Sequence, residues 1–253
     1  MNRVFITGAS SGIGAALAFL YARRGAQLGL VGRRTDALEA LRTSLPGGGH
    51  EVYELDVRNR EALHAAARHF LAGGPVDVVI ASAGISAGTL TEELDDFDVF
   101  EAIVATNLNA TVATFEPFIA SMKQRGQSRL VGVASVAAVR GLPGAGAYSA
   151  SKAAVRNYCE SLRVELRPSG IKVVTLVPGF IRTPMTAHNP YKMPFLMPVE
   201  RFAEQAVRAI EAGVSYKVIP WQMAWVAALL RCVPNGLYDY FAVRRKRKPR
   251  LHP

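Results

Sequence analysis

The chain has few cysteines, and they are not arranged for disulfides or metal binding. Cys159 and Cys232 are the two cysteines among 253 residues, and they lie far apart without metal-ligand partners at the usual spacing. We therefore expect neither a disulfide framework nor a metal site. Free thiols fit a reducing compartment, and an apolar strand begins almost at the first residue, which leaves no room for a signal peptide. The sequence thus favours a cytoplasmic protein.

Acidic residues are outnumbered by basic ones, although the imbalance is local. The chain contains 30 Lys and Arg against 20 Asp and Glu, a net charge of +10. The stretch from Arg244 to Arg250 supplies six of these charges and leaves +4 for the rest. The body of the chain also lacks the basic face or aromatic platform of a nucleic-acid-binding protein. We expect no nucleic-acid partner.

Uninterrupted apolar runs long enough to cross a bilayer are missing as well. The apolar segment that begins at Trp221 is broken by Arg231 and Pro234. Two tryptophans beside a basic run are typical of segments that lie on an anionic membrane surface. Alternatively, the segment packs over a substrate pocket or a subunit interface while the basic tail stays in solvent. Peripheral membrane contact and internal packing are both compatible with the sequence.

Apolar strands alternate with helical segments along most of the chain. We expect strands at 4–6, 27–31, 52–57, 76–81, 130–134, 171–177 and 217–219, and helices at 15–20, 35–41, 60–72, 97–123, 148–167 and 199–212. Strands that are apolar on both faces predict a parallel sheet with helices on both sides. The expected fold is a Rossmann-like, doubly wound α/β domain with about seven strands. We assign residues 1–220 to the dinucleotide-binding and catalytic part, and 221–253 to a C-terminal extension of the same domain.

A glycine-rich turn joins the first strand to the first helix. Gly8, Gly12 and Gly14 allow a tight backbone turn, and the N–H groups at the start of the helix then face an anion such as a pyrophosphate. Their spacing differs from the commoner G-x-G-x-x-G fingerprint. A tight turn without a ligand is the alternative interpretation.

In a doubly wound sheet, ligands bind beyond the carboxyl ends of the strands. Arg33 follows the second strand, nineteen residues after Gly14. An acidic residue there would bind the adenine ribose of NAD, whereas a guanidinium pairs with the 2′-phosphate of NADP. Arg34 can assist. The pattern therefore favours NADP(H), the alternative being a pair of solvated arginines.

Four polar residues are spaced for proton transfer. Tyr148 and Lys152 share one face of a helix, and a neighbouring ammonium lowers the pKa of a phenol, which suits a general acid/base. Ser135 ends the fifth strand, at the same edge of the sheet. Asn107 interrupts an apolar helical run, where an unpaired amide is costly. An exposed Tyr–Lys pair and a satisfied core amide are the structural alternatives.

Taken together, these motifs resemble the short-chain dehydrogenase/reductase family over residues 3 to about 220. The family's cofactor motif matches residues 7–14, and its catalytic tetrad matches Asn107, Ser135, Tyr148 and Lys152 in order and spacing. Residues 178–183 match the segment that holds the nicotinamide carboxamide. Ser82 stands where the family has asparagine, and we expect a structural adjustment there without loss of activity.

The resemblance implies a role for each of these residues. Tyr148 exchanges a proton with the substrate oxygen, Ser135 orients that oxygen, Lys152 binds the nicotinamide ribose and lowers the tyrosine pKa, and Asn107 holds a water of the proton relay. Asp56 and Val57 flank the adenine, and Ile181 and Thr183 hold the carboxamide. The residues expected to bind the cofactor are Gly8, Ser10, Ser11, Gly12, Ile13, Gly14, Arg33, Arg34, Asp56, Val57, Ala83, Gly84, Tyr148, Lys152, Pro178, Gly179, Ile181 and Thr183.

The predicted activity is an NADP(H)-dependent interconversion of a carbonyl and a secondary alcohol. Residues 184–198 carry four prolines and an adaptable apolar surface, which favours an apolar substrate, unless the segment only packs on its own core. In related enzymes, helices corresponding to 97–123 and 148–167 form subunit contacts, so we expect a homodimer or homotetramer. The alternative function is a non-catalytic NADP(H)-binding sensor or scaffold of the same fold.

Overall fold

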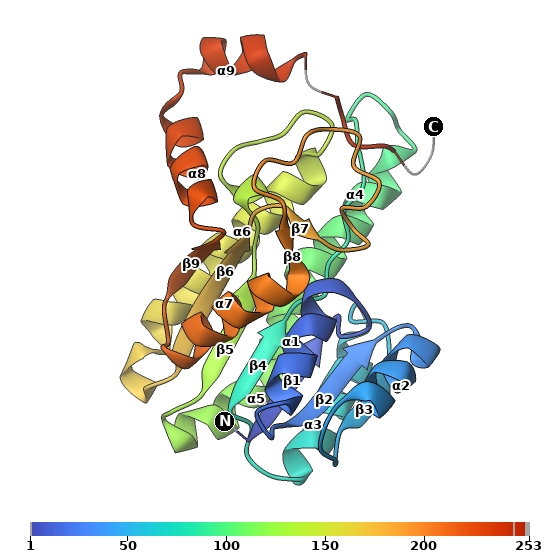
Figure 1. The fold of residues 1–253 in the computed structure, drawn as a ribbon, viewed down its shortest axis with the longest axis vertical. Coiled ribbons are helices and arrows are strands. Elements are labelled where there is room, and N and C mark those ends of the chain that lie inside the picture. The colour runs from blue at the N-terminus through green and yellow to red at the C-terminus, as the bar shows by residue number, and fades with distance from the viewer. Residues whose placement is uncertain (1, 245, 251–253) are drawn as a thin grey trace.

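A seven-stranded parallel sheet forms the centre of the protein, whose computed structural model describes residues 2–244 and 246–250 (Figure 1). Its strands are β1 (Arg3–Thr7), β2 (Gln27–Gly32), β3 (Glu51–Glu54), β4 (Val78–Ala81), β5 (Arg129–Val133), β6 (Lys172–Pro178) and β9 (Tyr216–Ile219). They follow the order β3-β2-β1-β4-β5-β6-β9, and all six pairings are parallel. The predicted Rossmann-like sheet is confirmed.

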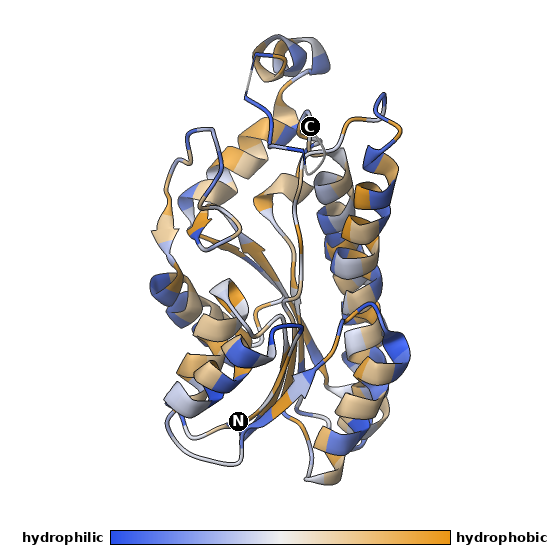
Figure 2. Cartoon of the chain, turned by 90° about the vertical axis from the view of Figure 1, so that its right-hand side faces the viewer, coloured by the Kyte–Doolittle hydropathy of each residue, from blue (hydrophilic) through white to orange (hydrophobic). Residues whose placement is uncertain are grey.

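Helices cover both faces of this sheet, as the doubly apolar strands require. One face packs on α1 (Gly12–Ala22), α2 (Thr35–Ser44) and α7 (Val199–Glu211). The other packs on α3 (Arg60–Ala72), α5 (Ala110–Arg125) and α6 (Gly146–Glu165). Along β1, the side chains alternate between the two cores, with Phe5 on one face and Val4 and Ile6 on the other. Figure 2 shows the apolar strands enclosed between these helical layers.

The order of the strands reverses beside β1, and this places the site. β1 pairs with β2 on one side and with β4 on the other. The connections that follow β1 and β4 therefore diverge and leave a crevice beyond their carboxyl ends. This is the edge at which the sequence concentrates its small and polar residues.

The helix predicted over 97–123 is in fact interrupted. It consists of α4 (Asp96–Val104), a π-helical turn (Ala105–Asn109) and α5. The turn holds Asn107, whose fully buried amide bonds the backbone of Ile85 outside the helix. Single π-helical turns of this kind often occur at functional sites. Short 3₁₀ turns at Val136–Ala138 and Arg167–Ser169 complete this half of the chain.

The proline-rich segment after β6 contains a small second sheet that we did not predict. It pairs β7 (Ile181–Arg182) with β8 (Met197–Pro198), each two residues long. Elements this short leave no periodic signal in a sequence. By joining the two ends of the segment, the pairing holds residues 183–196 as a loop above the cleft.

The C-terminal segment forms two helices, α8 (Gln222–Cys232) and α9 (Asn235–Ala242), which project from the body (Figure 1). Pro234 lies between them, where it cannot continue α8. Arg140 attaches them to the loop after β5: it donates hydrogen bonds to the carbonyl oxygens of Leu230 and Val233, and it lies 4.1 Å from the ring centroid of Tyr238. No helix among the described residues is both long and apolar enough to span a bilayer.

Part of the basic tail is bound to the body, which differs from the interpretation in which the whole tail stays in solvent: Lys248 and Arg250 are bound, whereas Arg244, Lys246 and Arg247 are exposed. Nε of Arg250 donates to the buried carboxylate of Asp96 at 2.9 and 3.1 Å. Nζ of Lys248 donates to Ser86 Oγ at 2.9 Å, and Gly88 N–H donates to the carbonyl of Pro249. Asp96 and Ser86 are thus partners for the charged side chains of Arg250 and Lys248, which the sequence alone does not reveal. Arg245 and residues 251–253 of the predicted tail lie outside the described residues.

Candidate active site

A cleft of about 370 Å³ opens at the carboxyl edge of the sheet. Apart from Asn107, every residue that the sequence assigned to the site lines this cleft. The cleft is also lined by Gly32, Leu55, Ile85, Thr106, Val133, Ala134 and Thr186, which the sequence reasoning missed. Most of them immediately follow a strand or flank a predicted residue, so the position of the strand ends was the signal that could have found them.

The glycine-rich turn forms a cradle at one end of the cleft. Gly8 and Gly12 have φ angles of +71° and +55°, which side chains rarely adopt. A Cβ on Gly14 would lie 2.2 Å from the carbonyl oxygen of Gly8, so the turn closes only with glycine at this position. Among the described residues, no side-chain hydrogen bond caps the start of α1, and no acidic residue lies in its first turn. The N–H groups at this helix end are therefore suited to a phosphate.

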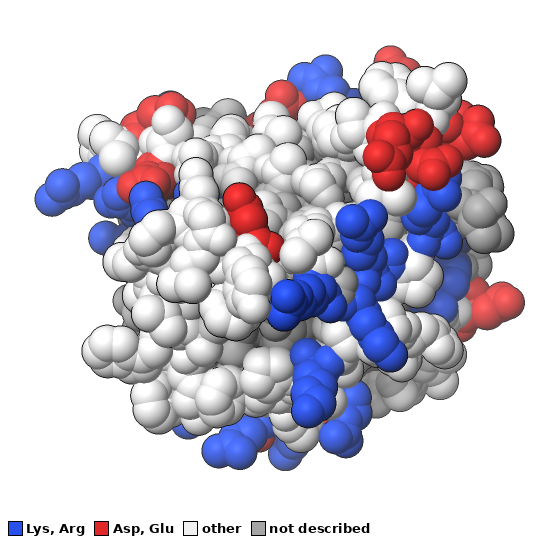
Figure 3. Space-filling model, turned by 90° about the horizontal axis from the view of Figure 1, so that it is seen from above, with Lys and Arg blue, Asp and Glu red and all other residues white. Residues whose placement is uncertain are grey.

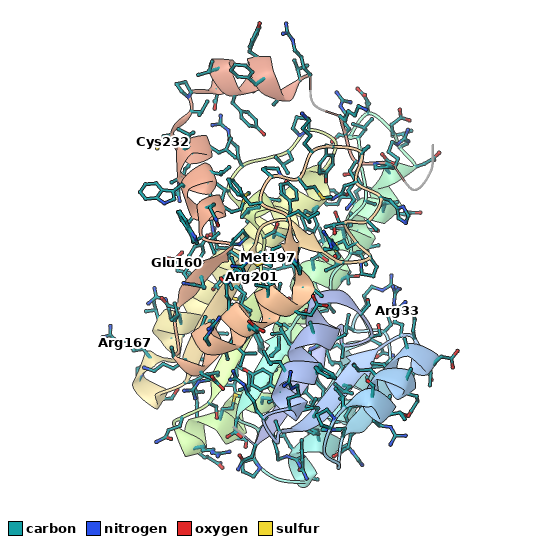
Figure 4. The ribbon with its side chains drawn as sticks, viewed as in Figure 1. Arg33, Glu160, Arg167, Met197, Arg201 and Cys232 are labelled. Carbon is teal, nitrogen blue, oxygen red and sulfur yellow. The ribbon has the colours of Figure 1, made fainter. Side chains whose placement is uncertain are left out.

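Two arginines lie beside this cradle at the end of β2. Arg33 is 64% exposed, and its guanidinium lies 4.0 Å from the carboxylate of Asp56 (Figure 4). Nη2 of Arg34 donates to the carbonyl oxygen of Ser10 at 3.0 Å, which ties the arginine to the glycine-rich turn. Arg58 donates to Asp56 and keeps the pKa of that carboxyl below its ordinary value. The cradle and the exposed guanidinium of Arg33 thus provide two places that attract anionic groups.

Tyr148 and Ser135 meet at the other end of the cleft. Ser135 ends β5, where its Oγ accepts the N–H of Ala137 at 3.1 Å and starts the 3₁₀ turn. Burial raises the pKa of the Tyr148 phenol above its ordinary value, its hydrogen bond with Ser135 lowers it, and Tyr191 adds a smaller upward effect. Lys152 is not among the groups that shift the pKa of Tyr148, so the expected lowering by its ammonium is not found in the chain alone.

Lys152 lies one helical turn beyond Tyr148 and is almost completely buried, with 5% of its surface exposed. Its Nζ donates to the carbonyl oxygen of Val133 at 2.8 Å. Burial lowers the pKa of this ammonium to about 8. A buried cation with one backbone acceptor retains two N–H donors, which suits it to bind hydroxyl groups in the cleft.

Asn107 lies behind this pair instead of in the cleft wall. Its Oδ1 accepts the N–H of Ile85 at 2.8 Å, and its Nδ2 donates to the carbonyl oxygen of Ile85 and to Ser151 Oγ. A Cβ on Gly84 would lie 3.2 Å from Asn107 Oδ1 and 3.4 Å from Lys152 Nζ, so both side chains border the same glycine. The amide is satisfied by protein groups, and it fixes the loop after β4 next to Lys152.

The segment 183–196 closes the cleft from above. Thr186 Oγ1 donates to the carbonyl oxygen of Ile181 at 2.7 Å and accepts the N–H of Thr183, which shapes the turn below it. The ring of Tyr191 contacts Phe180 at 6.4 Å between centroids. Further apolar side chains of the segment, Met185, Phe195 and Leu196, are between 36 and 50% exposed. Of these three side chains, Met185 lines the cleft and gives its mouth an apolar group.

Comparison with known proteins agrees with this arrangement. Residues 2–193 match the family model described as short chain dehydrogenase. An uncharacterized oxidoreductase of Myxococcus xanthus is 39% identical over 242 residues, which cover 94% of this chain and 95% of that protein.

Two solved structures bind different nicotinamide cofactors. A short-chain dehydrogenase from Sphingobium yanoikuyae in complex with NADPH superposes with a TM-score of 0.81 and 26% identity, and the match covers 97% of each chain. A 3-ketoacyl-(acyl-carrier-protein) reductase from Brucella melitensis, complexed with NADH, has a TM-score of 0.78 and 28% identity over 86% of this chain and 94% of its own. Both are oxidoreductase folds that hold a nicotinamide dinucleotide.

Proposed function

Because this chain belongs to the short-chain dehydrogenase family of oxidoreductases, we propose that it reduces a carbonyl compound or oxidises a secondary alcohol with NADP(H). The observation that supports the proposal most is the lining of the cleft. Tyr148, Ser135 and Lys152 line it together with the glycine cradle, which lies at the opposite end. A non-catalytic sensor of NADP(H) would need the cradle alone. It would not need a buried lysine beside two paired hydroxyl groups, which is costly to maintain.

The cleft residues divide between holding the cofactor and moving a proton. NADPH, when bound, supplies the hydride for the carbonyl carbon. The N–H groups at the start of α1 would hold the pyrophosphate, Arg33 and Arg34 the 2′-phosphate, and Ile181 and Thr183 the carboxamide. The Nζ of Lys152 would bind the nicotinamide ribose. Asp56 and Val57 would flank the adenine, and Pro178 and Gly179 would form the wall below the ring.

Tyr148 and Ser135 both act on the substrate oxygen, Tyr148 by transferring a proton and Ser135 by a hydrogen bond. In reduction, the hydroxyl of Tyr148 gives its proton to the substrate oxygen, and Ser135 donates a hydrogen bond that orients this oxygen. Lys152 stabilises the phenolate that remains, and Asn107 supports the path by which the proton returns. In oxidation, the same oxygen atom of Tyr148 removes the hydroxyl proton. In either direction, Tyr148 therefore transfers one proton for each hydride that the cofactor transfers.

The substrate and the assembly are inferred from exposed apolar surfaces. Met185, which lines the cleft, and the other exposed apolar side chains of its segment, Phe195 and Leu196, favour an apolar carbonyl or alcohol. On α4, Phe97 and Phe100 stack and are 62% and 40% exposed, which supports a homodimer or homotetramer formed through this layer. We also propose that residues 1–220 make up the cofactor-binding and catalytic part, and that 221–253 extend the same domain.

The function is tested with a panel of carbonyl and alcohol compounds followed by nicotinamide absorbance. Aliphatic, aromatic, steroid-like and acyl-chain members are each offered with NADPH or NADP⁺. We expect turnover on apolar members and little on small polar ones. NADPH binding without turnover on any member would support the sensor interpretation instead.

Exchanging the charge at the end of β2 should change the cofactor preference. We expect the unmodified protein to bind NADPH more tightly than NADH, and Arg33→Asp to bind NADPH about 10- to 100-fold less tightly, as for the loss of a charge-assisted hydrogen bond. NADH binding should change little, so the preference disappears or reverses. Cofactor titrations followed by fluorescence measure both dissociation constants.

A matched control is Arg23→Asp, which makes the same charge change at an exposed residue after α1, at the opposite end of the sheet. It should leave both dissociation constants unchanged. If the unmodified protein prefers NADH, the assignment of Arg33 to a 2′-phosphate is wrong.

A further inference from the structure

The outward side of α8 is an apolar stripe that none of the described residues covers. Trp221, Trp225 and Leu229 follow one another at four-residue spacing and are 63, 72 and 68% exposed. Residues four apart lie on one side of a helix, so these side chains form a continuous row. Within α8, which the structure describes in full, Met223 is the buried side chain. The sequence therefore builds a helix whose large apolar groups mostly face away from the core.

Helix α9 also exposes apolar side chains. Leu237, Tyr240, Phe241 and Val243 are between 51 and 67% exposed, and the rings of Tyr240 and Phe241 contact each other edge to face at 5.2 Å. Ala242 is the buried side chain of this helix. We refer to the seven exposed side chains of the two helices, Trp221, Trp225, Leu229, Leu237, Tyr240, Phe241 and Val243, as the α8–α9 face.

Exposed basic residues occur in the same C-terminal segment as the α8–α9 face, and one of them contacts it. Arg231, Arg244, Lys246 and Arg247 are exposed, and the guanidinium of Arg244 lies 4.5 Å from the ring centroid of Tyr240. Between residues 221 and 250 the sequence has a single acidic residue, Asp239. Viewed from above, the molecule shows Lys and Arg side chains gathered beside a broad uncharged area, and most acidic side chains lie toward the margins (Figure 3).

We propose that the α8–α9 face binds an anionic lipid surface. Aromatic side chains with an apolar body and a polar edge favour the boundary between lipid headgroups and acyl chains, and arginines beside them pair with lipid phosphates. The two helices stand out from the body as a protrusion, so they can enter a flat lipid layer without obstruction (Figure 1). A second copy of the chain fits less well, because it would bring two sets of arginines together.

The proposal concerns binding alone and does not depend on the reaction in the cleft. Nevertheless, the geometry connects the two regions. Arg140, in the loop between Ser135 and Tyr148, holds the end of α8 through the carbonyl oxygens of Leu230 and Val233.

Tryptophan fluorescence offers a direct test, because Trp221 and Trp225 are the only two tryptophans of the chain and both lie on the α8–α9 face. Vesicles of phosphatidylcholine with about 30% phosphatidylglycerol should shift the emission to shorter wavelengths and sediment the protein. Pure phosphatidylcholine vesicles should do so much less, and high salt should reverse the effect. An emission spectrum that anionic vesicles leave unchanged would overturn the proposal.

Two pairs of variants separate this face from the rest of the surface while keeping both tryptophans. Leu229→Glu should weaken binding to anionic vesicles about tenfold, whereas Val164→Glu, at a 60% exposed residue of α6, should not. Arg231→Gln with Arg244→Gln should weaken it about tenfold or more, and Arg23→Gln with Arg68→Gln should have little effect.

Tryptophan emission also distinguishes binding to lipid from binding of a second copy of the chain to the α8–α9 face. In that case the emission would shift with protein concentration in the absence of vesicles, together with a larger mass in light scattering that Leu229→Glu abolishes. This result, or equal weakening by the control variants, would overturn the lipid proposal.

Discussion

Tyr148→Phe is expected to lower kcat on the order of 10²- to 10⁴-fold, the range for removal of a general acid/base. The phenyl ring fills the same space beside Ser135 but has no proton to exchange with the substrate oxygen. The cradle and the two arginines lie at the other end of the cleft, so the dissociation constant for NADPH should stay within about twofold, in keeping with the additive behaviour of distant sites. Steady-state turnover on the best compound of the panel, together with cofactor titration, measures both quantities.

Tyr158→Phe is the matched control for this variant. Tyr158 lies on the same helix, α6, but its ring stacks with Phe115 on the helical layer away from the cleft. Removing its hydroxyl should change neither kcat nor NADPH binding. Unchanged turnover in Tyr148→Phe would refute the proposed role of Tyr148, whatever the control shows.

Lys152→Met should abolish most turnover and at the same time stabilise the cofactor-free protein. The ammonium is almost completely buried, and its pKa is lowered to about 8 because folding removes it from water. Methionine of similar length fills the space without this cost. Relief of about 1–3 kcal/mol corresponds to about 2–4 °C in melting temperature for each kcal/mol in a protein of this size. Thermal unfolding near neutral pH measures the gain.

The pH dependence identifies the cause of that gain. Below pH 8, the lysine is charged in both the folded and the unfolded chain, so the cost of burying the charge is fully present. Between pH 8 and the ordinary pKa of 10.5, the unfolded chain holds more protons, so the unmodified protein becomes more stable relative to the variant as the pH rises. The difference in melting temperature should therefore shrink across this interval. Lys123→Met, at an exposed residue of α5, should show neither effect.

The strands and the cleft could be predicted because their signals are local in the sequence. Most strands of the sheet are short apolar runs, and polar residues that come shortly after a strand lie at the carboxyl edge, as Arg33, Asp56 and Ser135 do. The glycine cradle depends on backbone angles that only glycine adopts readily, so the glycines at positions 8 and 12 predict it from the sequence.

Other features depend on contacts between distant residues and leave no local signal. The π-helical turn around Asn107 is stabilised by the backbone of Ile85, 22 residues earlier. One of the two interpretations of the C-terminal segment left the tail in solvent, because the sequence does not show that Arg250 meets Asp96, 154 residues away. The pKa of Tyr148 likewise depends on how many groups exclude water from it, which spacing alone does not reveal.

The contacts that hold the C-terminal helices on the body determine how easily these helices detach. Because α8 and α9 bury one side chain each, the anchoring of this segment depends mainly on polar contacts made by Arg140 and Arg250. Such contacts weaken as salt or acid is added, whereas the apolar layers around the sheet do not. We therefore expect detachment of α8 and α9 to cost less free energy than global unfolding, so that these helices exchange between attached and released forms while the dinucleotide cradle stays intact.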